Sequence, residues 1–145
     1  MLKSLLALSS LSTLAMMEGA GAATGATVRL ATRFDLPRVH DLIRQSYGAM
    51  NELTENKMVS FWAAGAEKAI VEGDLREPSF VCDYLESPGS SFWVAEFDSS
   101  IVGCVGLKQR GVDDAELVRM SVDESQRGKS IGALLISTLI SFCQR

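Results

Sequence analysis

The sequence predicts a mixed α/β domain in which helices cover a mostly antiparallel sheet. Apolar residues recur at helical spacing in two segments that follow a short first strand, residues 28–32. Three segments rich in aromatic and β-branched residues come next, joined by short turns, and an almost wholly apolar helical segment comes last. The order strand, helix, helix, strand, strand, strand, helix excludes a repeat protein and a helix bundle. The chain has 145 residues, 47% hydrophobic and 22% charged, which fits one compact domain.

The two helices of the first half have recognisable ends. Asp35 is expected to be the N-cap of the first, and Pro37 falls in its first turn, where the missing N–H has no intrahelical partner to lose. The apolar positions of this helix are Leu36, Val39, Leu42, Ile43 and Tyr47. Residues 57–72 carry a second helical pattern, which Gly73 and Pro78 end.

The second half predicts a hairpin, a third strand and a buried helix. Residues 91–97 and 101–107 are strands, and residues 98–100 join them as a tight loop. Residues 115–122 form the next strand. The helix that follows, residues 131–143, has polar side chains only at Ser137, Thr138 and Ser141, so we expect it to be buried against the sheet.

A strand, a glycine-containing loop and a helix start together predict an anion site at residues 127–133. The first backbone N–H groups of a helix have no intrahelical acceptor, and the helix dipole favours negative charge there. Gly128 and Gly132 lack a Cβ, which allows a phosphate to approach the backbone, and Arg127 and Lys129 add positive charge. The alternative is a solvated loop capped by Ser130 that binds nothing.

Glu116 is the candidate general base. Strict alternation along residues 115–122 places its side chain on the same face as Val118, Met120 and Val122. A carboxylate on an apolar face is costly to ionise, so we expect its pKa to be raised, as a general base requires. The alternative is an acid at a fraying strand end, next to the solvated acids at residues 113–114.

Composition argues against several other functions. The net charge of −4, the pI near 5.0 and the lack of a Lys/Arg block give nucleic-acid binding no support. The cysteines, Cys82, Cys104 and Cys143, are odd in number and widely spaced, which favours buried thiols in a reducing compartment over a disulfide framework or zinc site. A single histidine, His40, excludes a multi-histidine site, and we expect no metal.

Residues 1–27 differ from the rest of the chain. They hold one early lysine, an apolar and serine-rich run and a Gly/Ala/Thr linker. A secretory signal, a transit peptide and a disordered tail all fit this composition. We expect the remaining domain to be cytoplasmic. The sequence lacks the about 18 uninterrupted apolar residues of a transmembrane segment.

The segment around the anion site resembles a known family. The run from Glu116 to Ala133, ELVRMSVDESQRGKSIGA, preceded by a β-hairpin, looks like the acetyl-CoA-binding segment of the GNAT superfamily of N-acetyltransferases. The family's loop pattern, [Gln/Arg]-x-x-Gly-x-[Gly/Ala], falls on residues 127–132, with Ser130 in place of the central glycine. Serine would weaken phosphate binding if this position needs a positive φ, and would be harmless or capping if it is helical. Residues 84–96 resemble the camello-like (N-acetyltransferase 8-like) branch.

This resemblance implies a fold, a co-substrate and a reaction. Residues 28–145 would form a partial acyl-CoA N-acyltransferase domain that binds acetyl-CoA and transfers its acetyl group to a primary amine by direct attack. Glu116 would match the general base. The backbone around Met120, Ser121 and Val122 would pair with the pantetheine arm as an added strand does. The pyrophosphate would be held by Arg127, Gly128, Lys129, Ser130, Ile131, Gly132 and Ala133.

The family pattern extends beyond this sequence. By the resemblance, a further strand, a helix that commonly carries a general-acid tyrosine, and a final strand pair would follow, whereas the chain ends at Arg145. We therefore expect the C-terminal strands to be missing and one sheet edge to be open. The alternative function is a catalytically weak or inactive CoA-binding module that joins a partner or a second copy through that edge. A plain nucleotide-phosphate binder lacks the G-x-x-x-x-G-K-[S/T] spacing.

Overall fold

A computed structural model describes residues 25–52 and 57–145. The leader or tail predicted for the N-terminus lies almost wholly outside these residues. The described helices and strands are β1 (Thr27–Leu30), α2 (Leu36–Glu52), α3 (Lys57–Val71), α4 (Glu77–Phe80), β2 (Ser91–Phe97), β3 (Ser100–Gln109), β4 (Ala115–Val122) and α5 (Ile131–Cys143). None of the helices in this part of the chain has the length and apolar character needed to cross a bilayer.

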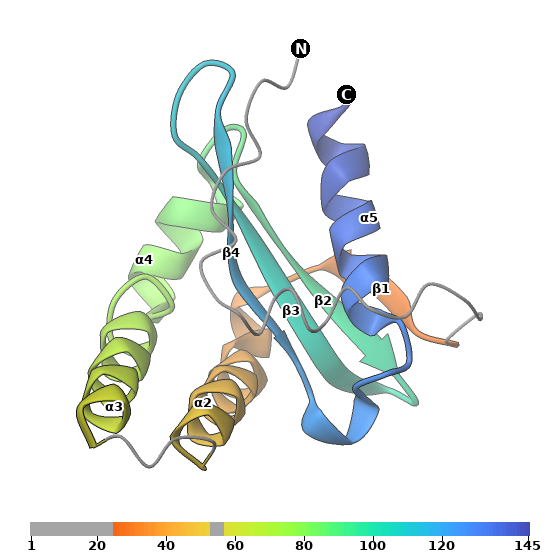
Figure 1. Cartoon of the computed structure of the whole chain (residues 1–145). Helices are drawn as coiled ribbons and strands as arrows, with labels where there is room; N and C mark the ends of the chain where they lie inside the picture. Colours follow the sequence, from red (N-terminus) through yellow and green to blue (C-terminus); the bar gives the residue numbers. More distant parts are fainter. Residues whose placement is uncertain (1–24, 53–56) are drawn as a thin grey trace.

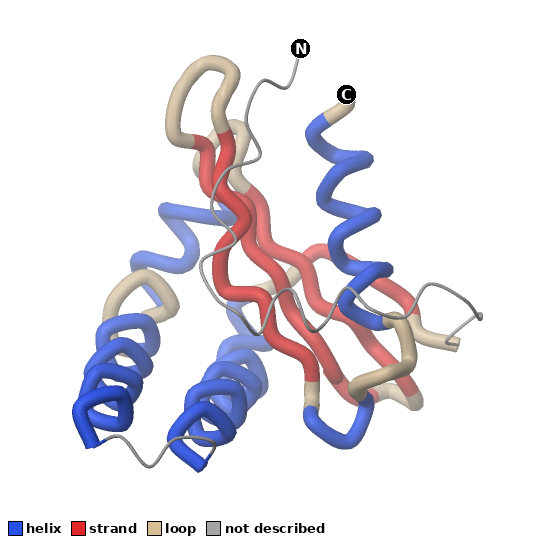
Figure 2. The backbone as a smooth tube through the Cα atoms, in the orientation of Figure 1, coloured by secondary structure: helices blue, strands red, loops and turns tan. Residues whose placement is uncertain are grey.

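The strands form one antiparallel sheet in the order β1-β2-β3-β4. Helix α5 covers one face, α2 covers the other, and α3 packs against α2 (Figures 1 and 2). The predicted mixed architecture is confirmed. The β2–β3 hairpin turns through Asp98 and Ser99, both left-handed with φ of 48° and 60°, which is the backbone twist that suits a two-residue hairpin loop.

Each face of the sheet carries its own apolar core. The core under α2 contains Leu36, Val39, Leu42, Ile43, Phe80, Tyr84, Phe92, Val94, Cys104 and Val118. The core under α5 contains Trp93, Ala95, Val105, Leu107, Leu117, Met120, Val122, Ile131, Leu135 and Leu139. A Cβ added to Gly103 of β3 would lie only 3.0 Å from Leu135 Cδ1 and 3.2 Å from Ile131 Cγ2. The N-terminal half of α5 therefore sits directly on the sheet, which fixes where the helix begins.

Asp35 does not act as the expected forward N-cap of α2. It ends a 3-10 turn, Arg33–Asp35. Its carboxylate accepts a hydrogen bond at 2.7 Å from the N–H of Thr32, which precedes it, and not from an N–H in the first turn of α2. The same carboxylate accepts two hydrogen bonds from the Arg29 guanidinium, at 2.8 and 2.9 Å, and Arg29 also reaches Glu96 at 2.9 Å. Asp35 thus joins the entrance of α2 to the two strands at one edge of the sheet.

We predict that Asp35→Asn destabilises the protein at neutral pH. The hydrogen bonds from Arg29 lower the pKa of Asp35 from its usual 3.8 to about 2. The ionised carboxylate therefore stabilises the fold fully above about pH 4, and this contribution is lost as pH falls toward 2. Because Arg29 is partly exposed, we expect a loss of about 1–2 kcal/mol at pH 7.

Urea unfolding at pH 7, 4 and 2.5 tests this, with Asp41→Asn as the control. Asp41 is exposed and contacts Arg44 at 3.5 Å, so its neutralisation should change stability by less than about 0.5 kcal/mol. An Asp35→Asn deficit that stays constant down to pH 2.5 would contradict the assignment.

Candidate functional site

The loop between β4 and α5 is tied to the rest of the fold through Asp123. This carboxylate accepts hydrogen bonds from the Ser125 N–H at 3.0 Å and the Ser125 hydroxyl at 2.7 Å. Arg38 of α2 donates to the other carboxylate oxygen and, through Nε, to the Ile101 carbonyl at 2.9 Å. The Ser125 and Arg38 hydrogen bonds outweigh partial burial and lower the pKa of Asp123. The loop therefore starts from a fixed, charged anchor.

The loop then turns through two left-handed residues before α5 begins. Gly128 has φ of 78°, and Ser130 has φ of 61°. The Leu134 N–H donates to the Ser130 carbonyl at 3.0 Å, so the N–H groups of residues 131–133 precede this first helical hydrogen bond. A Cβ added at Gly128 would meet no atom within 4 Å, so the loop is open on that side. N–H groups at a helix start beside an open loop are the arrangement on which anions commonly bind in proteins.

Both predicted cations lie at this loop. Arg127 Nε donates to the Val122 carbonyl at 3.3 Å, which holds the side chain against the end of β4. Lys129 Nζ donates to Gln126 at 2.9 Å and lies 5.7 Å from the centroid of the Phe97 ring. Positive charge therefore flanks the loop from two directions. These residues fit a pyrophosphate, which needs backbone N–H donors, open space and cations.

The conformation of Ser130 shows whether this position needs a positive φ, where serine is unfavourable, or is helical, where serine is harmless. The residue is left-handed, with φ of 61° and ψ of 18°, and its hydroxyl does not cap α5. A residue with a Cβ in this region is disfavoured by about 1 kcal/mol or more relative to glycine. The position therefore needs a positive φ, and serine carries backbone strain there.

Strand β4 contains a β-bulge at Arg119. Gly106 of β3 pairs with Val118, but two residues earlier Cys104 pairs with Ser121, so two residues of β4 oppose one of β3. The extra residue is Arg119, which is left-handed with φ of 55°. A single inserted residue reverses the alternation of side chains beyond it.

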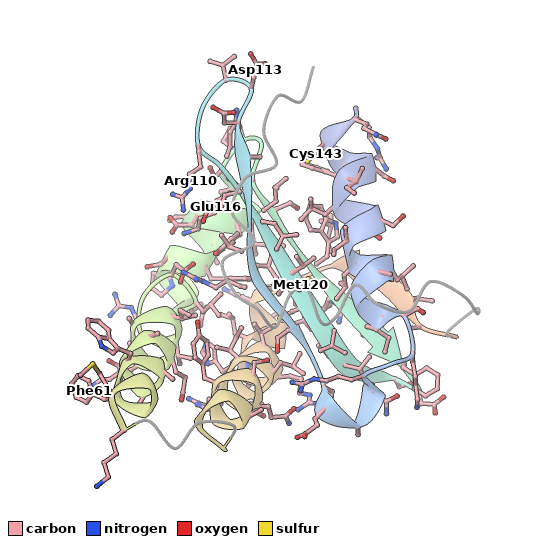
Figure 3. All side chains as sticks on the ribbon, viewed as in Figure 1. Phe61, Arg110, Asp113, Glu116, Met120 and Cys143 are labelled. Carbon is pink, nitrogen blue, oxygen red and sulfur yellow. The ribbon has the colours of Figure 1, made fainter. Side chains whose placement is uncertain are left out.

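The bulge corrects the prediction that Glu116 shares a face of the sheet with Met120 and Val122. Val118 does lie on the α2 side of the sheet, as Glu116 does by alternation, but Met120 and Val122 lie in the core under α5. Figure 3 places Glu116 beside Arg110 on one side of β4 and Met120 on the side of α5. Strict alternation was wrong for Met120 and Val122, because it did not allow for the extra residue.

Glu116 is paired with a cation. Its Oε2 lies 2.6 Å from Arg110 Nη2 and accepts from Arg110 Nε at 2.7 Å. The Glu116 side chain is 25% exposed. The carboxylate therefore lies at a solvent-accessible margin, held by Arg110.

The bulge also orients the peptide between Arg119 and Met120. The Cys104 thiol of β3 donates to the Arg119 carbonyl at 3.3 Å, which directs that carbonyl toward β3. In a planar trans peptide the next N–H points the opposite way. The Met120 N–H therefore points away from the Cys104 side chain, on a strand that pairs with no strand beyond it among residues 25–52 and 57–145.

Ser121 contributes only its backbone to this edge. Its side chain is fully buried, and the hydroxyl donates to the Leu42 carbonyl of α2 at 2.8 Å and contacts the Ser46 hydroxyl. Val122 and Met120 are also buried. The side chains of these three residues thus anchor the strand, while its backbone runs along the open edge.

Sequence reasoning missed the partner of Arg119. The Arg119 guanidinium donates to both carboxylate oxygens of Asp74, at 3.1 and 3.2 Å, and the Tyr84 hydroxyl donates to Asp74 at 2.5 Å. Burial alone would raise the pKa of Asp74, but the Tyr84 and Arg119 hydrogen bonds lower it overall. The sequence feature that could have indicated such a partner is Arg119 itself, a charged residue between the apolar residues Val118 and Met120.

A cavity elsewhere in the structure is separate from this loop. A hollow of about 260 Å³ lies between the β3–β4 turn and the C-terminal end of α5, near Asp113 and Cys143 (Figure 3). The loop is at the other end of α5, about 20 Å away along a helix of this length.

Part of this chain is similar in sequence to known N-acetyltransferases. Mouse N-acetylaspartate synthetase is 45% identical over 60 residues, 41% of this chain and 20% of that protein. Rat N-acetyltransferase 8 is 38% identical over 66 residues, 42% of this chain and 30% of that protein. The probable N-acetyltransferase camello of Xenopus laevis is 38% identical over 64 residues. The matches thus span less than a third of these relatives' lengths.

Solved structures share the fold. The PaiA N-acetyltransferase of Thermoplasma acidophilum, solved with coenzyme A, superposes with a TM-score of 0.65 at 20% identity, over 82% of this chain and 72% of that one. A GNAT acetyltransferase of Staphylococcus aureus Mu50 gives 0.62 at 22% identity, over 82% and 66%. The sequence profile of the Acetyltransferase (GNAT) family matches residues 50–145, which include the bulged strand, the loop and α5. The chain therefore belongs to the acetyltransferase (GNAT) family.

Proposed function

We propose that this chain binds acetyl-CoA along β4 and at the start of α5 and transfers the acetyl group to a primary amine. The observation that most supports this is the juxtaposition of two features. A loop with left-handed Gly128 and Ser130 leads into the start of α5, and the bulge at Arg119 lies on the edge strand β4, where the Met120 N–H would face outward. A pyrophosphate and an acylated thiol at the two ends of one extended ligand would need such a pair of sites.

The loop would hold the pyrophosphate. The N–H groups of residues 131–133 and the helix dipole would bind its oxygens, and Arg127 and Lys129 would add positive charge. The backbone of residues 120–122 would hydrogen-bond the pantetheine amides as an added strand does. Because α5 rests on Gly103 of β3, the two sites keep a fixed separation.

The Met120 N–H would polarise the acyl group. When bound, acetyl-CoA would supply a thioester: as the amine nitrogen forms a bond to the carbonyl carbon, the C–S bond would break, and CoA would leave as a thiolate that takes up the proton lost by the attacking nitrogen. The N–H points away from the Cys104 side chain and would donate a hydrogen bond to the acyl oxygen, on which negative charge develops. A preoriented backbone donor needs no reorganisation during the reaction.

Glu116 would remove the ammonium proton through water. Glu116 lies four residues before Met120, which corresponds to about 13 Å along a strand. The bulge at Arg119 shortens this path, and proton transfer to Glu116 would be direct or through water, with a bridging water the better fit to the separation. Arg110 holds the carboxylate at the solvent margin, where a chain of water molecules could deliver the proton to it.

The test is acetyl-CoA turnover by the purified chain with a panel of amines. Aspartate belongs in the panel because of the similarity to N-acetylaspartate synthetase, together with free lysine, a polyamine and a lysine-containing peptide. Release of CoA thiol that depends on an amine supports the proposal. Stabilisation by CoA without thiol release from any amine would favour the alternative, a binding module without catalysis.

We predict that Ser130→Gly stabilises the protein by about 1 kcal/mol and tightens CoA binding. Glycine adopts the observed φ of 61° without strain. Ser130→Ala is the matched control, because it removes the hydroxyl and keeps the Cβ. Thermal unfolding and calorimetric titration with CoA measure both effects. If alanine improves stability as much as glycine does, backbone strain at Ser130 is not the cause.

We predict that Glu116→Gln lowers kcat/KM for the amine by about 10²- to 10⁴-fold, the usual contribution of a general base. The dissociation constant for CoA should stay within about threefold of the wild-type value, because Glu116 is far from the pyrophosphate loop. Asp113→Asn is the control, since Asp113 is an exposed acid on the same hairpin (Figure 3). Equal rates for Glu116→Gln and the control would remove Glu116 from the mechanism.

A further inference from the structure

The bulged residue Arg119 is held by a side-chain cluster that the proposed reaction does not yet use. Arg119 donates to both carboxylate oxygens of Asp74, which lies in the connection between α3 and α4. The two side chains are 27% and 12% exposed, so the pair is largely shielded from solvent. Lys108 of β3 also contacts Asp74, at 3.3 Å. The extra residue of β4 is therefore tied to the helical layer across the α2 face.

Asp74 is in turn fixed by a buried ring. The Tyr84 hydroxyl donates to Asp74 at 2.5 Å, and Tyr84 is 1% exposed. The rings of Phe80 and Phe92 lie 5.6 and 5.1 Å from the Tyr84 ring, centroid to centroid. A tyrosine packed between two aromatic rings cannot change rotamer without opening the core. The acceptor of the Arg119 guanidinium is thus immobile.

The backbone at Arg119 requires such a restraint. Its φ of 55° is a conformation that residues with a Cβ rarely adopt. The Arg119 carbonyl accepts a hydrogen bond from the Cys104 thiol of β3, which is a weak donor. Without another restraint, the Arg119–Met120 peptide could rotate and carry the Met120 N–H away from the edge of β4.

We propose that Asp74 and Arg119 form a positioning clamp, which holds the Arg119–Met120 peptide so that the Met120 N–H faces the open edge of β4. This inference rests on the proposed function for its catalytic consequence. Arg119 is a positioning residue here, because it acts through the orientation of its own peptide and not by contact with a reactant.

Two substitutions at one position separate the clamp from direct binding. Arg119→Ala removes the guanidinium and keeps a strained Cβ, whereas Arg119→Gly removes the guanidinium and lets the backbone adopt a positive φ freely. Arg119→Ala should lower kcat by about 10- to 100-fold, because a misdirected backbone donor resembles a lost one. The KM for acetyl-CoA should change little. Arg119→Gly should recover most of kcat.

Alkylation of Cys104 gives a readout that does not depend on activity. Cys104 is fully buried and donates to the Arg119 carbonyl, whereas Cys82 is exposed and serves as the internal reference. The rate of iodoacetamide modification at each cysteine is measured by mass spectrometry without acetyl-CoA. Arg119→Ala and Asp74→Asn should each raise the Cys104 rate about 5- to 30-fold relative to Cys82, the range expected for loss of a restraint on a left-handed residue. Arg119→Gly should protect Cys104 nearly as well as the wild type does.

Arg76→Ala is the control, because Arg76 is an exposed arginine two residues from Asp74 and should leave both readouts unchanged. Wild-type protection of Cys104 in Arg119→Ala and Asp74→Asn would overturn the clamp. An Arg119→Gly variant as slow as Arg119→Ala, with a raised KM for the amine, would also overturn it in favour of direct contact with the acceptor. If the wild-type chain acetylates no amine, the proposed function fails, and Cys104 alkylation alone decides whether the clamp exists. If Arg119→Ala does not fold, Asp74→Asn and Arg119→Gly still decide it.

Discussion

Strand β4 must serve two apolar cores, and the site depends on how it does so. Before the bulge, Val118 faces the core under α2; after it, Met120 and Val122 face the core under α5. A regular strand would have placed these side chains on a single face. One additional residue, Arg119, moves Met120 and Val122 to the face of Leu117, so that all three pack under α5. The same left-handed residue orients its carbonyl to the Cys104 thiol, so one residue sets both the packing of the strand and the orientation of the Arg119–Met120 peptide.

The loop before α5 also owes its left-handed backbone to the packing on either side of it. Asp123 and Arg38 fix its start, and the contact of α5 with Gly103 fixes its end. Between these fixed points the chain must reverse direction within a few residues, which needs left-handed backbone at Gly128 and Ser130. The open N–H groups at the helix start are therefore a result of restraints on both sides. Contacts within the chain hold both the bulge and the loop, through Asp74 and Arg119 at one and Asp123 and Arg38 at the other.

Much of this could be predicted from the sequence, because periodic patterns report burial. Residues 91–97, 115–122 and 131–143 were expected as a strand, a strand and a helix, and β2, β4 and α5 have these bounds. What could not be predicted depends on single backbone angles. The bulge at Arg119 does not alter the residue pattern by which the strand is predicted. The positive φ at Ser130 depends on where α5 packs on the sheet. Asp35 was misassigned because Arg29, six residues earlier, competes for its carboxylate.

The division of the apolar side chains into two cores has a consequence for cooperativity. Strand β3 contributes side chains to both cores. Cys104 belongs to the core under α2, while Val105 and Leu107 belong to the core under α5. Detachment of α5 would expose one face of this strand and leave the other covered. Local opening on the α5 side could therefore occur at lower free energy than global unfolding. The loop proposed to bind the pyrophosphate lies on the α5 side. A bound ligand would therefore stabilise the core under α5 directly and the core under α2 only through the sheet between them.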